Sequence, residues 1–228
     1  MPTAIVTGAS RGLGLALARA LVDRGWRLVI DAREPWPLEQ AAATLGPDVV
    51  ALAGDVADEW HRRALVAAAG DRIDLLVNNA SVLGPSPQPP LARYPLGALE
   101  QVYRVNVVAP LALAQLVLPR LPEGGRIVNL SSDAAVEPYP GWGGYGSAKA
   151  ALDHATAILA AEQPELRIYA VDPGDMNTAL HQAAFPGEDI SDRPPPEASV
   201  PGLLALLEGR LPSGRYRARD VAPIGAAG

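Results

Sequence analysis

The stretch TGASRGLG, residues 7–14, lies between a short apolar run and a segment of helix-forming composition, and it decides the fold prediction. Its glycines, Gly8, Gly12 and Gly14, follow the spacing G-x3-G-x-G. A tight turn and a close approach of the backbone to a ligand both need glycine, and the start of a helix offers free N–H groups to an anion. The stretch therefore predicts a strand, a phosphate-binding turn and a helix at the beginning of the chain.

The rest of the chain repeats this alternation of strand and helix. Continuous apolar runs indicate strands buried on both faces of a parallel sheet, and they lie at 4–7, 27–30, 49–55, 73–79, 125–132, 166–173 and 213–218. Helices are expected at 12–24, 36–45, 58–69, 96–121, 145–161 and 197–208. This order is typical of βαβ units with right-handed crossovers. We predict one α/β domain over residues 1–228, a Rossmann-like doubly wound parallel sheet of about seven strands with helices on both faces.

Composition excludes several kinds of function. The formal net charge is −6, which argues against a nucleic-acid partner because such a partner favours a basic face. Cysteine is absent, so disulfides and thiol nucleophiles are excluded. The histidines, His61, His154 and His181, are far apart and lack metal-ligand spacing. We expect no metal site, a solvated His61 and a His154 on the packing face of its helix.

The location is expected to be cytoplasmic. The first predicted strand begins at residue 3, which leaves no room for a targeting segment before it. No apolar run reaches the length of a membrane span, so we expect no membrane contact.

Two stretches interrupt the pattern of strands and helices. GPSPQPP at 84–90 and FPGEDISDRPPPE at 185–197 are rich in proline and glycine. Both follow the ends of predicted strands, so both should lie at the carboxyl edge of the sheet, where ligands bind in α/β folds. We expect the second to form a short substrate lid at about residues 179–199.

Six motifs in sequence order make the chain resemble the short-chain dehydrogenase/reductase family along its whole length. A single glycine turn would be weak support, whereas six ordered motifs are specific. They are TGASRGLG at 7–14, GDV at 54–56, NNA at 78–80, Asn106 within YRVNV, SS at 131–132 with YGSAK at 145–149, and DPGDMNT at 172–178.

The resemblance implies a nicotinamide dinucleotide cofactor and a set of residues that bind it. These residues come from the matched motifs and from the end of the second predicted strand. They are Gly8, Ser10, Arg11, Gly12, Leu13, Gly14, Arg33, Asp55, Val56, Asn79, Ala80, Tyr145, Lys149, Pro173, Gly174, Met176 and Thr178.

The second predicted strand ends in VIDAR, and this ending bears on the choice of cofactor. An acidic side chain there would bind the adenosine ribose 2′-hydroxyl and repel a 2′-phosphate. Counted from Gly8, the family's acidic position falls on Ala32, with Arg33 next and Arg11 in the turn, which resembles the pattern that selects NADP(H). Asp31 lies one residue earlier and should point to the opposite face. A register shifted by one residue would bring Asp31 to the ribose and favour NAD(H).

Lys149 is the single lysine among 19 basic residues. It stands four residues after Tyr145, so the two side chains would share a helix face. A nearby ammonium favours a phenolate and lowers the pKa of a tyrosine toward the working range. The resemblance adds that this lysine binds the nicotinamide ribose. We therefore expect Tyr145 to be the acid–base catalyst and Lys149 to lower its pKa.

The resemblance implies two further catalytic residues. Ser132 matches the serine that holds the substrate oxygen, and its neighbour Ser131 should point away because side chains alternate along a strand. Asn106 matches the asparagine that bends the long helix and anchors a water leading to Lys149. The walls of the substrate pocket are expected to come from Val82, Leu83, Asp133, Tyr139, Trp142, Met176, His181 and Phe185.

These features predict an NADP(H)-dependent oxidoreductase that transfers a hydride between nicotinamide and the carbonyl or secondary alcohol of a small, moderately apolar molecule. A non-catalytic NADP-binding sensor or scaffold of the same fold is the first alternative, and it is disfavoured because every catalytic residue is present. An epimerase or dehydratase is the second, and it is disfavoured because relatives of that kind carry a larger substrate domain.

The carboxyl end, SGRYRARDVAPIGAAG, departs from the glycine-rich ending common in the family. In many relatives that ending builds a tetramer interface. We therefore expect a homodimer through the helices at 96–121 and 145–161, with a tetramer as the alternative.

Overall fold

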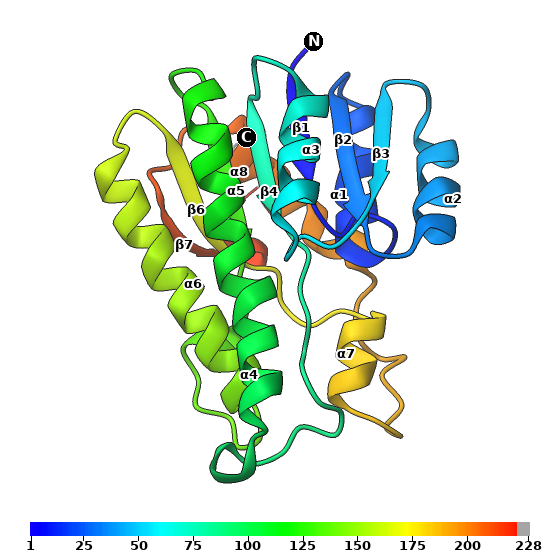
Figure 1. Ribbon diagram of the computed structural model, residues 1–228, viewed down its shortest axis with the longest axis vertical. Coiled ribbons are helices and arrows are strands. Elements are labelled where there is room, and N and C mark those ends of the chain that lie inside the picture. Colours follow the sequence, from blue (N-terminus) through cyan, green and yellow to red (C-terminus); the bar gives the residue numbers. More distant parts are fainter. Residues whose placement is uncertain (223–228) are drawn as a thin grey trace.

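Within residues 1–222, which the computed structural model describes, seven parallel strands form one sheet in the order β3-β2-β1-β4-β5-β6-β7. This order confirms the predicted doubly wound sheet (Figure 1). The last six residues of the expected domain lie outside this description. The strands are β1 (Thr3–Val6), β2 (Arg27–Ala32), β3 (Val49–Ala53), β4 (Leu75–Asn78), β5 (Arg126–Leu130), β6 (Arg167–Asp172) and β7 (Gly214–Arg217).

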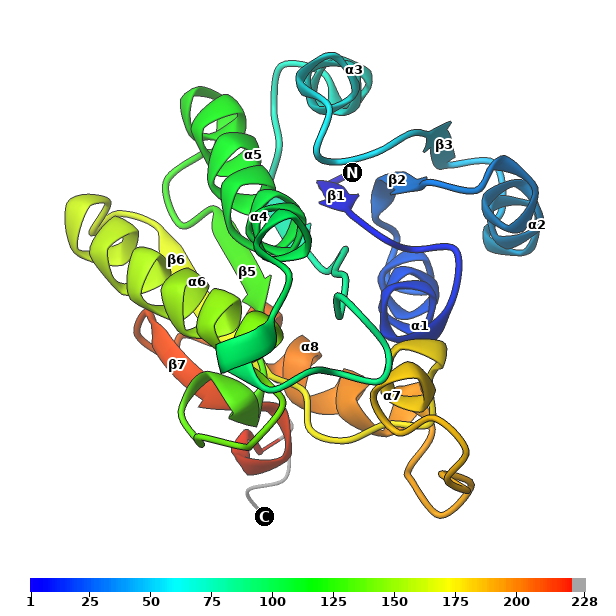
Figure 2. The same ribbon diagram turned by 60° about the horizontal axis from the view of Figure 1, so that its bottom comes forward.

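Helices cover both faces of the sheet, as Figures 1 and 2 show. One face packs on α1 (Gly12–Val22), α2 (Pro35–Leu45) and α8 (Val200–Glu208). The other packs on α3 (Glu59–Ala69), α5 (Ala109–Val117) and the end of α6 (Gly143–Glu162). Side chains alternate along each strand, so Val6 and Ile30 belong to the first layer whereas Ile5 and Val29 belong to the second. This two-sided burial explains why the strands are continuous apolar runs in the sequence.

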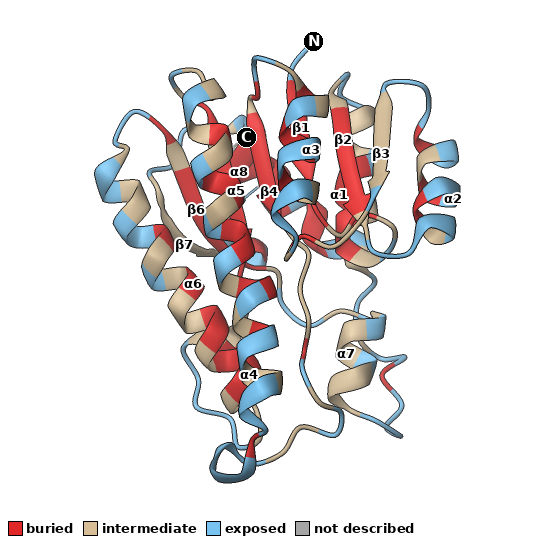
Figure 3. Cartoon of the chain, viewed as in Figure 1, coloured by how far each residue is buried: buried red, intermediate tan, exposed pale blue. Residues whose placement is uncertain are grey.

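The two edge strands are less covered than the centre (Figure 3). All residues of β1 and β4 are buried, whereas those of β3 and β7 are only partly buried or exposed. The apolar content of the sequence is thus concentrated where helices lie on both sides of the sheet.

The helical segment Leu96–Arg120 is interrupted at its middle. It consists of α4 (Leu96–Tyr103), a π-helical turn (Arg104–Val108), α5 and a final 3-10 turn (Leu118–Arg120). Its length and apolar composition match those of a membrane-spanning helix, contrary to the expectation that no segment reaches that length. The buried side chains of α5 pack on the sheet and on α3, which accounts for its apolar character.

The carboxyl edge of the sheet carries a helix that the sequence did not predict, α7 (Ala179–Ala184). It lies within the expected lid, and it projects below the sheet together with α4 (Figure 1). Ser86 Oγ donates to the carbonyl oxygen of Ala183 at 2.6 Å, so the proline-rich stretch at 84–90 is joined to α7. Figure 2 shows α7, α4 and the segment after β4 arranged around the ends of the strands.

Candidate active site

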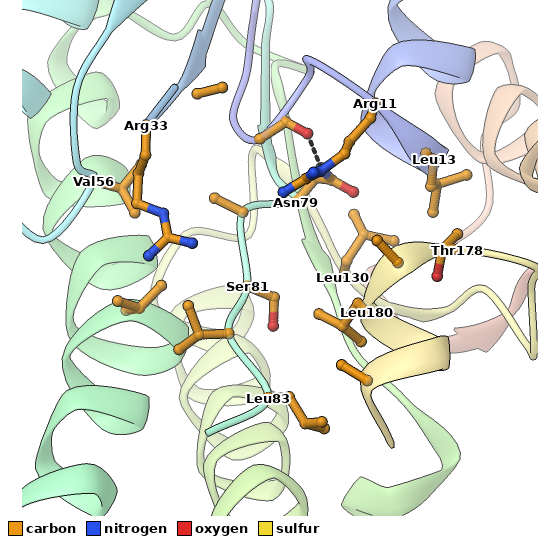
Figure 4. Close-up of a pocket in the computed structure, with 18 of the residues that line it drawn as sticks. Arg11, Leu13, Arg33, Val56, Asn79, Ser81, Leu83, Leu130, Thr178 and Leu180 are labelled. Carbon is orange, nitrogen blue, oxygen red and sulfur yellow. Dashed lines mark hydrogen bonds between the residues drawn. The ribbon is translucent and has the colours of Figure 1, made fainter. Parts of the chain in front are cut away.

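The glycine turn between β1 and α1 is held by side chains from neighbouring strands. Asn79 Nδ2 donates to the carbonyl oxygens of Thr7 and Gly8 at 2.8 and 3.0 Å, and Figure 4 shows the second of these bonds. Thr7 Oγ1 accepts the N–H groups of Asn79 and Ala80, each at 3.0 Å. Gly8 and Gly12 have φ values of 66° and 58°, a left-handed conformation that favours glycine. The family-like NNA motif therefore shapes the turn in this structure.

Gly14 is required by packing rather than by its backbone conformation. A Cβ atom there would lie 2.5 Å from the Gly8 carbonyl oxygen and 2.5 Å from Asn79 Nδ2. No side chain caps the start of α1, and its first turn has no acidic residue. The first N–H groups of the helix are therefore open to an anion.

A cleft of about 900 Å³ runs along the carboxyl edge of the sheet (Figure 4). It brings together most of the residues that the sequence analysis selected: Gly8, Ser10, Arg11, Gly12, Leu13, Arg33, Asp55, Val56, Asn79, Ala80, Tyr145, Lys149, Pro173, Met176 and Thr178. Among the described residues, four selected ones do not border it: Gly14, Gly174, Asn106 and Ser132. The first three shape the backbone around the cleft, and Ser132 is discussed below.

Two arginines and several carboxylates stand at the end of the cleft nearest β2. Arg11 and Arg33 extend into it from the glycine turn and from the end of β2 (Figure 4). Glu34, which the sequence analysis overlooked although it follows Arg33 directly, borders the same space. Its Oε1 lies 3.7 Å from Arg11 Nη2, and both side chains are largely exposed. An exposed pair of this kind is worth at most about 1 kcal/mol, so an incoming anion can compete for Arg11.

Asp31 lies on the face of β2 opposite to Ala32, as alternation predicted, because Ala32 packs with the layer of α1 whereas Asp31 contacts His61 of α3. It is buried under the glycine turn, where its Oδ1 accepts the Gly8 N–H at 2.7 Å. Its Oδ2 lies 3.0 Å from His61 Nε2. The prediction of a solvated His61 is wrong, since that side chain is only 8% exposed. His154 is exposed, which contradicts its predicted packing role.

Tyr145 and Lys149 are both buried on one face of α6 at the wall of the cleft. Lys149 Nζ donates to the Leu130 carbonyl oxygen at 2.6 Å and lies 5.4 Å from the centre of the Tyr145 ring. The predicted pairing of the two side chains on one helix face is therefore present. The lysine amine is anchored to the end of β5 rather than to the phenol oxygen.

The expected lowering of the Tyr145 pKa by Lys149 is not what this structure shows. Burial raises the pKa of Tyr145 well above its ordinary value, the nearby Ser81 hydroxyl lowers it, and the Asp133 and Asp172 carboxylates raise it. Burial also lowers the pKa of Lys149 to about 8, against an opposite effect of Asp153. Desolvation disfavours both charged forms, and the spacing of the two residues in the sequence does not reveal it.

The buried amine leads to a prediction about stability. The folded-state pKa of Lys149 is about 8 and the ordinary value is 10.5, so folding disfavours the ammonium by about 3 kcal/mol at 1.36 kcal/mol per pKa unit. This cost is fully present below pH 8 and disappears as the pH rises toward 10.5, because the folded state releases its proton first. Lys149→Met should therefore stabilise the protein at pH 7 by up to about 3 kcal/mol. Urea unfolding at pH 7 and at pH 9.5 checks this, and an advantage that does not shrink at the higher pH would contradict it.

The two serines after β5 behave differently from the expectation. Ser131 borders the cleft, although alternation predicted that it points away. Ser132 Oγ donates to Asp133 Oδ1 at 2.9 Å, and it also accepts the N–H of Ala134 at 3.1 Å. Asp133 Oδ2 in turn accepts the Tyr139 hydroxyl at 3.1 Å. The Ser132 hydroxyl is thus part of a polar chain beside the cleft.

Arg215, on the edge strand β7, holds the backbone at Ser132, and no motif marks it in the sequence. Its Nη2 donates to the Ser132 carbonyl oxygen at 2.9 Å, and its Nε pairs with Asp153 Oδ2 at 2.8 Å. Asp153 lies one helical turn after Lys149 on α6. The carboxyl end of the chain is therefore connected to the loop and the helix that carry the candidate catalytic residues.

Asn106 lies in the π-helical turn, as the predicted bend in the long helix requires. Its Oδ1 accepts the Val82 N–H at 2.9 Å and the Ser81 hydroxyl at 3.2 Å, and its Nδ2 donates to the Val82 carbonyl oxygen at 2.9 Å. Turns of this type recur at functional sites. Here the turn fixes the segment after β4, which forms one side of the cleft.

Aromatic side chains gather beside Tyr145 at the lid end of the cleft. Trp142 packs edge-on against Tyr145 and also against Phe185, each with ring centres 5.9 Å apart. The ring centres of His181 and Phe185 are 4.9 Å apart, and those of Tyr139 and Trp142 are 6.4 Å apart. Of the expected pocket walls, Val82, Leu83 and Met176 border the cleft, whereas the aromatic residues and Asp133 form a layer beside it.

The residues present fit a nicotinamide dinucleotide. The uncapped helix start suits a pyrophosphate, and a methyl group could not be placed at Gly14 without displacing the turn. From the turn the cleft continues past Asn79 to Tyr145 and Lys149, which matches the extended shape of a dinucleotide bound along the carboxyl edge of such a sheet.

Comparisons with known proteins agree with this geometry. The profile of the family described as short chain dehydrogenase matches residues 2–189. The chain is 31% identical to a benzil reductase ((S)-benzoin forming) of Saccharomyces cerevisiae over 92% of its length and 86% of that protein, and 33% identical to the sepiapterin reductase of Mus musculus over 79% and 76%. A short chain dehydrogenase from Shigella flexneri, solved in complex with NADP, superposes with a TM-score of 0.88 at 27% identity and covers 96% of this chain and 97% of that one.

The match to the family profile covers most of the chain, and the alignments with the relatives cover most of the length of each relative. The glycine turn and the YGSAK segment both lie within the residues that the profile matches. The chain belongs to the short-chain dehydrogenase/reductase family and is an oxidoreductase of alcohol or carbonyl groups.

Proposed function

We propose that the protein reduces the carbonyl group of a small aromatic or otherwise apolar molecule with NADPH. The observation that carries this proposal is the burial of Tyr145 and Lys149 at the wall of a cleft that begins at an uncapped glycine turn with Arg11 and Arg33 beside it. A bound reduced nicotinamide would supply the hydride. The chain's own residues must then bind the carbonyl oxygen, give it a proton and exclude water.

Each candidate catalytic residue has a distinct part in this proposal. Tyr145 gives its phenolic proton to the substrate oxygen, and its high pKa keeps that proton in place until charge develops on the oxygen. Ser132 would hold the oxygen by a hydrogen bond once its hydroxyl turns from Asp133 Oδ1, to which it donates in this structure. Lys149 would bind the ribose beside the nicotinamide, and Asn106 fixes Ser81 and Val82 after β4. The buried surroundings strengthen all these interactions because the effective dielectric constant is low.

The preference for NADP(H) is supported by the two arginines beside Ala32. A 2′-phosphate would lie between the guanidinium groups of Arg11 and Arg33, and charge-assisted bonds of this kind are strong. The complex of the Shigella flexneri relative with NADP agrees with this choice. Glu34 opposes it through its pair with Arg11.

Removing Arg33 should therefore weaken NADPH selectively. Arg33→Ala is expected to raise the Kd for NADPH about tenfold, or about 1.4 kcal/mol, and to leave the Kd for NADH nearly unchanged. Arg63→Ala is the matched control, because Arg63 is exposed on α3 and pairs only with Glu59 among the described residues. Fluorescence titration with both cofactors at moderate salt measures the effect. Equal losses for NADPH and NADH would show that Arg33 does not bind the 2′-phosphate.

The substrate is proposed to carry an aromatic ring next to its carbonyl group. Trp142 and Phe185 form a tilted pair beside Tyr145, and Leu83, Leu180 and Ala183 border the cleft there. Aromatic rings favour edge-to-face contacts of this geometry. The similarity to a benzil reductase, an enzyme named for a diaryl diketone, supports the same class. Residues 179–199 are proposed to act as a lid that opens to admit this substrate.

Turnover tests the proposal directly. Consumption of NADPH is followed by the absorbance of the reduced nicotinamide with benzil, an aryl alkyl ketone and an aliphatic ketone of similar size. The account expects the aryl ketones to react fastest and NADH to serve less well. Trp142→Ala should reduce the preference for aryl over aliphatic ketones. A protein that binds NADPH but reduces no carbonyl compound would instead match the sensor alternative.

A further inference from the structure

Asp31, the residue before the end of β2, is a buried carboxylate at the edge of the cleft. Asp31 is 1% exposed, although it stands one residue before the position at which an acidic side chain would bind the ribose. Its two oxygens are both engaged, one by the Gly8 N–H at 2.7 Å and the other by His61 Nε2 at 3.0 Å. Asp31 also borders the cleft together with Ala32 and Arg33. The carboxylate therefore lies at the ribose end of the site, but it is buried and both of its oxygens already have a partner.

His61 reaches Asp31 because the neighbouring strand end has room for its ring. It lies in the first turn of α3, and its ring lies directly against the backbone of Gly54. A Cβ atom at Gly54 would be 2.2 Å from His61 Nδ1. The Gly54 N–H donates to the Ala32 carbonyl oxygen at 3.0 Å, so the ring is enclosed between α3 and the ends of β2 and β3. Gly54 is thus needed for the pair, and any larger residue would displace the imidazole.

The charge of Asp31 matters because of what surrounds it. Arg11, Arg33 and Glu34 line the same end of the cleft, and Asp55 follows Gly54. An unpaired carboxylate at Asp31 would add a negative charge near the place where a 2′-phosphate would bind. With its proton on Nε2, His61 donates to Asp31 Oδ2, and this bond holds the carboxylate on the α3 side of β2. Neither partner needs to touch the cofactor for this effect.

We propose that Asp31 and His61 form a specificity-determining pair, in which His61 sequesters the carboxylate so that the site accepts a 2′-phosphate and does not bind the free 2′-hydroxyl. The pair would also hold Gly8 in the turn through the Asp31 bond to its N–H. The proposal rests on the NADP(H) preference proposed above, and it explains how an acidic strand end is compatible with that preference.

The test compares the ratio of the Kd for NADH to the Kd for NADPH in four proteins. His61→Ala should lower this ratio at least tenfold, because the freed carboxylate repels the 2′-phosphate and can accept the ribose hydroxyl. His61→Gln should keep the ratio within about threefold, since a glutamine amide can donate from nearly the same position as Nε2. Adding Asp31→Asn to His61→Ala should restore the ratio, because the amide has no charge. Both cofactors are titrated on the same sample, so a partly unfolded fraction cancels in the ratio.

Two results would overturn the proposal. In the first, His61→Ala weakens NADH and NADPH by the same factor, which would make the pair a purely structural support. In the second, Asp31→Asn fails to reverse the change, which would show that the carboxylate is not its cause. If the unaltered protein binds both cofactors equally, the proposed preference fails, whereas the direction of the change in His61→Ala still decides the role of the pair.

Discussion

Replacing Lys149 by arginine is expected to lower kcat/KM at least a hundredfold although it preserves the positive charge. Lys149 is 3% exposed, its Nζ donates to the Leu130 carbonyl oxygen, and it lies 5.4 Å from the centre of the Tyr145 ring. A guanidinium is wider and planar, and it stays charged, whereas burial lowers the pKa of Lys149 to about 8. The guanidinium group would displace either the end of β5 or the Tyr145 ring. Steady-state kinetics over pH 6–9 measures the loss.

Two further variants separate the contributions of charge, shape and proton donation. Lys149→Met should lose at least as much activity as the arginine variant, and both should bind NADPH less tightly because the ribose loses its donor. Tyr145→Phe should lose at least as much activity but keep its NADPH affinity within about threefold, since it removes one hydroxyl. A Lys149→Arg protein with nearly normal turnover would show that charge alone suffices at this position.

The second large effect is expected at Gly14. Gly14→Ala should raise the Kd for NADPH at least a hundredfold, because its Cβ would stand 2.5 Å from the Gly8 carbonyl oxygen and from Asn79 Nδ2. The turn and the start of α1 would have to separate, and the N–H groups that face the phosphates would separate with them. Forced overpacking of this kind also costs about 1–3 kcal/mol of stability, which thermal unfolding can measure.

Gly97→Ala is the matched control for Gly14→Ala. Gly97 lies in α4, and a Cβ atom there would meet nothing within 4 Å. Alanine is favoured over glycine in a helix by about 1 kcal/mol, so this variant should be as stable as the unaltered protein or more so. NADPH affinity should be unchanged by it. If Gly14→Ala bound NADPH as tightly as Gly97→Ala does, close packing at the turn would not be needed for the cofactor.

The sheet and the cleft were predictable because both depend on local patterns. Strands buried on two faces are continuous apolar runs, and Val6 and Ile30 on one side with Ile5 and Val29 on the other show why. Gly8 and Gly12 meet a left-handed backbone requirement, and Gly14 meets a packing requirement that leaves no room for a Cβ atom. The helix α7 escaped prediction because it is short and adjoins a segment rich in proline and glycine.

The errors concern side chains whose surroundings come from distant parts of the chain. His61 stands among charged neighbours in the sequence, and only the approach of β2 and the missing Cβ at Gly54 bury it. The direction of the Tyr145 pKa shift was misjudged because burial is its largest cause. Arg215 lies on the last strand, far in sequence from the Ser132 carbonyl group that it binds. Burial by distant segments and tertiary hydrogen bonds do not appear in local sequence patterns.

The central claim is that Tyr145 gives a proton to a carbonyl oxygen while NADPH is consumed, and one comparison tests it most directly. The unaltered protein and Tyr145→Phe, each saturated with NADPH, are mixed with benzil, and the loss of reduced nicotinamide absorbance is followed. The account predicts steady consumption by the unaltered protein and a rate at least a hundredfold lower for Tyr145→Phe, with equal NADPH binding. Equal rates for the two proteins would contradict it.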